Sequence, residues 1–291
     1  MSELIHMEKL ESRYILDLSF KLESPLHIGC RVEGFTKLPL QFSVGGRRVP
    51  IVPAESLKGV LRNLASSLFS VALPQCELAR YHRKDSHVRE ENLEELRQKY
   101  YELAKEELKR IFPEESVRDL DEGVVQLLEY YLTLRCPVCR LFGGKGVSAK
   151  LLISDGLPEG RVELFRYAST AIDRKTRIAA ENRLFEVVSV KPDDGLRYRF
   201  RIIVDNVKKG SDDAILLSLL LDFVRRFGIS VGGLKSRGYG RLALDEDRSS
   251  AIILKLVTDA GGNALHNVRA LLLRDGYYER MNLKDFIGWL K

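Results

Sequence analysis

Residues 232–241 have the sequence Gly232-Gly233-Leu234-Lys235-Ser236-Arg237-Gly238-Tyr239-Gly240-Arg241, which follows an amphipathic helix pattern and precedes a strand pattern. Glycine allows the backbone to take a positive φ and to come close to a ligand. Exposed N–H groups beside Lys and Arg form a cradle for an anion, and we expect that anion to be a phosphate chain. Alternatively, the glycines only end the helix near Phe227-Gly228 and turn the chain into a strand.

The composition indicates a folded, highly charged protein. Of the 291 residues, 45% are hydrophobic and 30% are charged, which suits either two domains or one domain with insertions. The net charge of +6 permits a nucleic-acid partner without requiring one. No stretch approaches the roughly 18 apolar residues of a membrane span, the polar start lacks a signal-peptide core, and four cysteines are too few for a disulfide framework. We therefore expect a cytoplasmic protein with no membrane partner.

The order of strand and helix patterns predicts the fold. Residues 14–22 and 197–204 alternate at period two, and further strands are expected at 149–155 and 241–244. Helices are expected at 57–68 and from 211. Without residues 74–140, the order is strand, helix, strand, strand, helix, strand, as in ferredoxin-like and RNA-recognition-motif folds. The paired aromatic residues that stack on RNA bases in such sheets are absent, so we expect contacts through loops and backbone phosphates.

The first predicted helix offers a second phosphate-sized site. Ser56 could cap its N-terminus, with Lys58 in the first turn and Arg62 one turn later. A capped surface helix with cations is the alternative. Farther along, the glycine-rich turn 141–146 contains Lys145, and its alternative is a plain loop.

Residues 74–140 have the composition of a helical insertion with metal-ligand residues at both ends. Cys76, His82 and His87 stand at its start, and Cys136-Pro137-Val138-Cys139 stands at its end. If two helices form a hairpin, Cys76, Cys136, Cys139 and one of the two histidines could hold a structural zinc ion. Ordinary reduced thiols and a redox pair are the alternatives. A redox motif usually opens a helix, whereas here we expect a glycine-rich turn to follow.

Residues 166–180 are too polar for a core strand and predict an exposed hairpin with a basic tip. This hairpin completes a set of four motifs that occur in a fixed order along the chain. The motifs are Leu26-His27-Ile28-Gly29, Pro53-Ala54-Glu55-Ser56-Leu57-Lys58-Gly59-Val60-Leu61-Arg62, Ala171-Ile172-Asp173-Arg174-Lys175-Thr176, and the stretch 232–240. Together they resemble the RAMP superfamily of CRISPR-associated proteins, and within it the backbone (Cas-seven-type) subunits of type III effector complexes.

The resemblance implies an α+β protein with a modified ferredoxin-like palm, a helical, zinc-bearing finger insertion and a thumb hairpin. The expected boundaries are 1–73 and 141–260 for the palm, with the thumb at about 160–190, then 74–140 for the finger and 261–291 for a C-terminal helical extension. It also implies a ribonucleoprotein filament in which copies or paralogues of the subunit, together with other effector subunits, bind CRISPR RNA and present target RNA in antiviral defence.

The same resemblance implies particular RNA contacts. Guide phosphates would meet the first helix, the two glycine-rich segments and the thumb, and base pairing by the guide would supply the sequence specificity. The expected contact residues are Ser56, Lys58, Arg62, Lys145, Ile172, Asp173, Arg174, Lys175, Gly233, Lys235, Ser236, Arg237 and Tyr239.

One departure from the family pattern concerns catalysis. Subunits of this family that cut target RNA, with a divalent metal ion, use an aspartate in the loop after the first strand. Between Leu26 and Pro53 this chain has no Asp, and Glu33 is the only carboxylate. Glu33 is therefore the candidate base, although we expect that this subunit does not cut. The alternatives are a stand-alone CRISPR RNA processing endoribonuclease with His27 as base, and a scaffold that binds no RNA.

Overall fold

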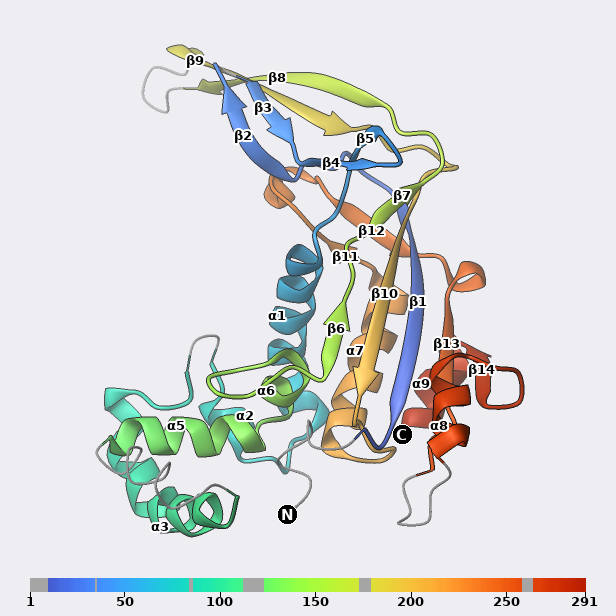
Figure 1. The fold of residues 1–291 in the computed structure, drawn as a ribbon. Coiled ribbons are helices and arrows are strands. Elements are labelled where there is room, and N and C mark those ends of the chain that lie inside the picture. Colours follow the sequence, from blue (N-terminus) through green and yellow to red (C-terminus); the bar gives the residue numbers. More distant parts are fainter. Residues whose placement is uncertain (1–9, 35, 84–85, 112–122, 173–178, 258–263) are drawn as a thin grey trace.

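An antiparallel sheet organises the structure, a computed structural model that describes residues 10–34, 36–83, 86–111, 123–172, 179–257 and 264–291 (Figure 1). The sheet is built on β1 (Arg13–Leu22), which pairs along its length with β10 (Arg197–Asp205). On the other side of β1 lie β12 (Arg241–Leu244) and β13 (Ser250–Leu254). Beyond β10 lie β6 (Leu151–Ile153) and β7 (Leu157–Glu159), and β11 (Ile229–Ser230) pairs with β12.

The strand order confirms the ferredoxin-like palm. The four strands of the predicted order are, along the chain, β1, β6, β10 and β12. In the sheet they lie in the order β12, β1, β10, β6, so two β-α-β units interleave. The connecting helices are α1 (Ala54–Ala72) and α7 (Asp212–Phe227), and they pack against one another. Short 3-10 turns at η2 (Lys235–Arg237) and η3 (Glu246–Arg248) flank β12.

Alternation along the strands separates the two faces of the sheet. The even-numbered side chains of β1 and β10, among them Leu16, Phe20 and Phe200, are almost fully buried under the helices. Phe20 and Phe200 meet edge to face with ring centroids 5.7 Å apart. Burial follows the period-two pattern along β10, whereas β1 is also buried on its odd-numbered face at Ile15, Asp17 and Ser19.

A second sheet lies at one end of the palm (Figure 1). It consists of β2 (Gly29–Glu33), β3 (Thr36–Pro39), β8 (Leu164–Ile172) and β9 (Ala179–Val190). Strands β8 and β9 form the predicted hairpin, whose tip, with Asp173, Arg174 and Lys175, lies outside the described residues. Beside this sheet, β4 (Gln41–Val44) and β5 (Arg47–Pro50) form a hairpin through Gly45 and Gly46, both with positive φ.

The insertion is helical, as the sequence predicts, and lies at the end of the molecule opposite to β8 and β9 (Figure 1). Its elements are α2 (Leu78–Tyr81), η1 (Glu90–Asn92), α3 (Leu93–Ile111), α5 (Val124–Arg135) and α6 (Pro137–Phe142). Helices α3 and α5 pack on one another, which brings the start and the end of the insertion together. The cysteine motif does open a helix, with Cys136 as the N-cap residue of α6, so the expectation of a turn at this point is wrong.

A buried ionic network ties the insertion to the palm. Asp213, at the start of α7, is 2% exposed and accepts hydrogen bonds from Arg140 Nη2 at 2.8 Å and Lys150 Nζ at 2.7 Å. Arg140 directly follows the cysteine motif, and Lys150 directly precedes β6. A buried carboxylate is tolerated because two cations and their hydrogen bonds compensate it.

The C-terminal segment contains a strand as well as helices. Helix α8 (Ala264–Leu271) is followed by β14 (Tyr278–Asn282), which pairs antiparallel with β13, and by α9 (Leu283–Leu290). Phe286 of α9 is fully buried and meets Tyr14 of β1 edge to face. The segment is thus part of the main sheet and of the core. Among the described residues, no helix combines the length and the apolarity that crossing a membrane requires.

The glycine loop, residues 231–240, packs backbone against backbone. Gly240 has a φ of 78°, and a Cβ placed on it would overlap the carbonyl oxygen of Val231. Gly238 has a similar φ of 82°, but a Cβ there would meet no atom within 4 Å. The two positions therefore separate backbone strain from steric overlap.

We predict that Gly240→Ala lowers the free energy of unfolding by roughly 3 kcal/mol or more, because strain and overlap add. Gly238→Ala, the matched control, should cost only about 1–2 kcal/mol, the strain alone. Urea denaturation of both variants measures the difference. Equal losses would mean that the backbone contact at Gly240 contributes nothing.

Candidate nucleic-acid interface and metal centre

The glycine loop is fixed against the segment that follows β1. Gly233 N donates to His27 O at 2.9 Å, and Gly240 N donates to Pro25 O at 2.8 Å. A Cβ on Gly232 would lie 2.5 Å from His27 O, so glycine is needed there for close approach as well as for its φ of 80°. The loop is therefore a rigid support for the residues between these contacts.

Most backbone donors of the loop are used inside the protein. The N–H groups of Gly233, Arg237, Gly238, Tyr239 and Gly240 all donate to carbonyl oxygens of the chain. The sequence predicted that exposed N–H groups of this loop form an anion cradle. These five N–H groups are instead bonded to carbonyl oxygens within the protein. What the loop presents is the side chains of Lys235, Ser236 and Arg237, which are exposed on η2. An anion would meet these side chains.

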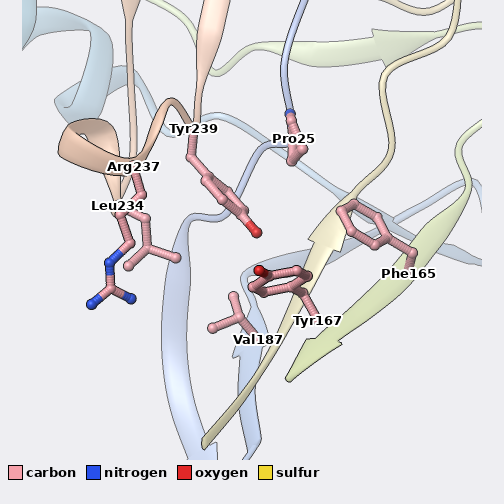
Figure 2. Close-up of a pocket in the computed structure, with 7 residues that line it drawn as sticks. All are labelled: Pro25, Phe165, Tyr167, Val187, Leu234, Arg237 and Tyr239. Carbon is pink, nitrogen blue, oxygen red and sulfur yellow. The ribbon is translucent and has the colours of Figure 1, made fainter. Parts of the chain in front are cut away.

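Aromatic side chains surround this basic turn. Tyr239 and Arg237 line a pocket together with Phe165 and Tyr167 from β8, and Figure 2 shows the hydroxyl ends of Tyr239 and Tyr167 directed into the same space. Burial raises the pKa of Tyr239, so its hydroxyl stays protonated at neutral pH and can donate a hydrogen bond. Phe165 and Tyr167 were not among the residues expected from the sequence, because β8 resembles an ordinary polar strand.

The candidate residues on α1 have other surroundings. The helix begins at Ala54, after Pro53, so Ser56 lies inside the first turn and the prediction that it caps the helix is wrong. Asp155 accepts a hydrogen bond from Ala54 N at 2.7 Å, and a carboxylate thus already lies at this helix end. Lys58, the fifth residue of α1, is half-buried.

Two further candidates lie near the insertion. Arg62 is half-buried, and its Nη1 donates to Gly143 O at 2.8 Å, so this guanidinium links α1 to the turn after α6. Lys145 is exposed in that turn, where Gly144 and Val147 exchange backbone hydrogen bonds.

The remaining candidate in the described residues, Ile172, lies away from the insertion. It ends β8, opposite Ala179 of β9.

The open face of the palm sheet is charged but internally neutralised. Its side chains on β1 and β10 include Asp17, Lys21, Arg197, Arg199 and Arg201. Each of the four cations lies within 4 Å of a carboxylate. The nearest pair is Lys21 Nζ with Asp194, at 2.7 Å. Without stacking rings and with its cations paired, this part of the sheet is poorly suited to bind RNA.

The two candidates for a catalytic base, Glu33 and His27, differ in exposure. Glu33 is exposed at the end of β2, in register with Thr36 of β3. His27 is only 5% exposed, and its Nδ1 lies 2.8 Å from Val188 O on β9. His27 thus joins β9 to the glycine loop, which is the packed role that its apolar neighbours in the sequence favour.

A buried cluster of metal-ligand side chains lies where α2 meets α6. His82, His87, Cys136 and Cys139 offer ligand atoms that all lie within 4.8 Å of one another. His82 Nδ1 is 3.4 Å from Cys136 Sγ and 3.5 Å from His87 Nε2, which is 3.8 Å from Cys139 Sγ. Four N and S ligands around a tetrahedral ion stand about 3.3–3.8 Å apart, so these residues fit a metal ion.

Hydrogen bonds outside the cluster orient both imidazoles. Glu129 Oε1 accepts from His87 Nδ1 at 2.9 Å, which turns Nε2 of the same ring toward Cys139. Ser66 Oγ donates to Arg62 O and so accepts from His82 Nε2 at 3.0 Å, which leaves Nδ1 facing Cys136. Partners of this kind are typical around metal-ligating histidines.

The electrostatics of the cluster favour a thiolate. Hydrogen bonding from Cys136, and then from His82 and His87, lowers the pKa of Cys139 to about 3. Burial raises the pKa of Cys136. Burial by itself would lower the pKa of His87. Hydrogen bonds to Cys139 and Glu129 outweigh the effect of burial and raise this pKa to about 9.

Cys76 does not belong to this group, which contains both histidines, whereas the sequence predicted Cys76 and only one of the two. Its thiol is half-buried in the turn between α1 and α2, and burial and the nearby Asp212 raise its pKa. The short helix α2 carries the chain past Cys76 and delivers His82 to the cluster instead.

A match to a family model shows the family of the chain. Residues 19–243 match the model of the RAMP superfamily. No curated protein matches the chain. Among solved structures, the chain is similar to one from a "Type IV-B CRISPR Complex", at 17% identity over 87% of this chain and 96% of that chain, with a TM-score of 0.47.

We predict that the purified chain contains about one divalent metal ion and that Cys136→Ser loses it, because a tetrahedral site with a missing thiolate binds weakly. Cys76→Ser should keep the ion and serves as the matched control. Metal analysis of freshly reduced protein and limited proteolysis measure both effects, and only the insertion should become sensitive in Cys136→Ser. Metal-free wild-type protein, or metal loss in Cys76→Ser alone, would contradict the ligand set.

Proposed function

This chain belongs to the RAMP superfamily, and from that premise we propose that it is an RNA-binding backbone subunit of a CRISPR ribonucleoprotein effector complex. The observation that supports this proposal most directly is the rigid glycine loop that presents Lys235, Ser236 and Arg237 to solvent beside aromatic side chains. Cations of this kind bind phosphates and do not distinguish bases. A guide RNA would supply the sequence specificity by base pairing.

The second sheet supports a backbone role. Strands β8 and β9 extend the hairpin beyond the palm (Figure 1), as a thumb that contacts RNA or a neighbouring subunit would require. We propose that copies or paralogues of this chain line up along one CRISPR RNA and present target RNA to it. The order of the four sequence motifs favours a type III complex.

The metal in this proposal is a structural zinc ion. Two imidazoles and two thiolates in a closed tetrahedral set are the donors that Zn²⁺ prefers. His82, His87, Cys136 and Cys139 would hold it, and it would fix α6 against α2, far from the glycine loop in Figure 1. Its role is to stabilise the insertion.

We propose further that this subunit does not itself cut RNA. Between Leu26 and Pro53 the chain lacks the aspartate that cutting members of the family use, and the one carboxylate in that stretch, Glu33, is exposed at the end of the short strand β2. Attack by a 2′-OH needs a base held in fixed geometry. The burial of His27, whose ring contacts Val188 O, disfavours the alternative of a processing endoribonuclease that uses His27 as base.

Replacing Lys235 and Arg237 together by Ala should weaken binding of single-stranded RNA evenly across sequences. Because two phosphate contacts are lost, the slope of log K against log salt should fall in magnitude by about 1.4. Fluorescence anisotropy over a salt series measures both. Arg280→Ala with Lys284→Ala, an equal change in charge at exposed C-terminal positions, should leave the slope unchanged. An unchanged slope in the loop variant would refute the assignment of the loop as a phosphate site.

Glu33→Ala should change cleavage of target RNA by an assembled complex less than about threefold, whereas loss of a general base typically costs about 10²–10⁴-fold. Product analysis on denaturing gels, with RNA binding measured in parallel, makes the comparison. If one cleavage product disappears while binding is intact, this chain is a nuclease subunit and Glu33 is its base.

A further inference from the structure

The turn formed by residues 143–147 leads from α6 to the palm and carries one exposed cation, Lys145. Gly144 and Val147 close this turn by exchanging backbone hydrogen bonds at 3.0 and 3.2 Å. Among the residues that the structure describes, none forms an ion pair with Lys145, so its charge is available to a ligand. The turn follows directly on α6, the short helix that brings two cysteines to the cluster of His82, His87, Cys136 and Cys139.

The cluster touches the turn directly at Cys139. Gly143 N donates to Cys139 O at 2.8 Å. A Cβ placed on Gly144 would lie 3.4 Å from Cys139 Cβ and 3.6 Å from its Sγ, so the backbone of the turn lies against the side chain of this ligand. Helix α6 has only six residues and packs against both α1 and α5 (Figure 1). A shift of Cys139 would therefore be passed to the turn with no flexible segment between them.

Helix α1 supports the turn on the side of His82. Ser66 Oγ accepts from His82 Nε2 at 3.0 Å and donates to Arg62 O at 2.9 Å. The guanidinium of Arg62 donates through Nη1 to Gly143 O at 2.8 Å. Arg62 thus connects the partner of one ligand histidine to the first residue of the turn.

Helix α5 supports the turn on the side of His87. Glu129 Oε1 accepts from His87 Nδ1 at 2.9 Å and from Thr133 Oγ1 at 3.4 Å. A Cβ on Gly144 would lie only 2.5 Å from Thr133 Cγ2, so the turn rests on this methyl group. The turn therefore has three supports, and each of them is a residue of the cluster or is bonded to one through a single partner.

We propose that the RNA contact of Lys145 depends on metal binding at this cluster. The inference rests on the proposed RNA-binding function and adds a regulation to it, because a loaded cluster would keep the turn where Lys145 meets a phosphate. Metal binding contributes directly to the folding of the residues around a site, so an empty cluster lets Cys139 and its neighbours repack. Arg140 still holds the end of α6 on Asp213, and we therefore expect a displaced turn and not an unfolded palm.

The first test measures binding of single-stranded RNA by the full chain before and after its metal is removed with a chelator. Removal should lower the magnitude of the slope of log K against log salt by about 0.7, the share of one phosphate contact. In Lys145→Ala this contact is already lost, so removal should not change the slope further. The double variant Lys235→Ala with Arg237→Ala, which changes only the glycine loop, should still show the full effect of removal and is the matched control.

The second test moves the turn and leaves the ligands in place. Gly144→Ala pushes against Thr133 Cγ2 and should lower the slope by the same amount, about 0.7, with the metal content unchanged. Thr133→Ser removes this methyl group and keeps the hydroxyl that bonds Glu129, so in combination with Gly144→Ala it should restore the wild-type slope. Gly288→Ala in α9 adds a Cβ that meets no atom within 4 Å, and it should change nothing.

A slope that does not respond to metal removal, or that falls equally in Lys145→Ala, would overturn the inference. An unchanged slope in Gly144→Ala, no recovery with Thr133→Ser, or wild-type protein without metal would overturn it as well. Failure of the proposed function looks different, because metal-loaded wild-type protein would then bind no RNA at all. RNA binding that depends on Lys235 and Arg237 but not on metal would leave the proposed function standing and reject only the role of the cluster.

Discussion

At Gly232 the backbone of the glycine loop lies so close to the segment after β1 that no side chain fits between them. Gly232 approaches the carbonyl of His27, Gly233 donates to that carbonyl, and Gly240 donates to Pro25. The ring of His27 in turn contacts β9. Three parts of the chain that are far apart in sequence are thereby held in one geometry. These backbone contacts support the exposed cations of η2 and the tyrosine that follows it.

This arrangement explains why the candidate interface lies at the junction of loop and hairpin and not on the sheet. On the open face of the palm, the arginines of β10 are paired with carboxylates such as Asp17 and Glu159. Such pairs contribute little to stability where they are exposed, but they leave little net charge to attract an anion. At the junction, one cation, Arg237, and three aromatic side chains line the same pocket, so the charge and stacking surface that RNA needs occur together.

The insertion depends on a different constraint, the burial of charge. Asp213 lies under both Arg140 and Lys150, so α7, α6 and the start of β6 share one buried carboxylate. Next to this network, α6 carries the two cysteines into contact with His82 and His87. Removing either partner of Asp213 would leave a buried charge uncompensated, which is usually far more costly than losing a surface pair. The histidine and cysteine cluster is therefore linked to the palm through α6, although α6 lies far from β11 and β12, which flank the glycine loop, in Figure 1.

The sequence by itself determined the strands β1, β10 and β12, the helices of the palm and the insertion, the β8–β9 hairpin and the ferredoxin-like order, because each follows from periodicity or turn residues within a few positions. It also located the cysteine motif and both histidines. Only the tertiary structure decided which of these lie together: α2 turns the chain so that His82 and His87 meet the motif and Cys76 does not. It likewise placed Asp155 at the start of α1, paired β14 with β13, and joined Tyr167 to Tyr239 in one pocket. These contacts link residues far apart in the chain, and no local pattern records which of the many possible long-range partners packing will select.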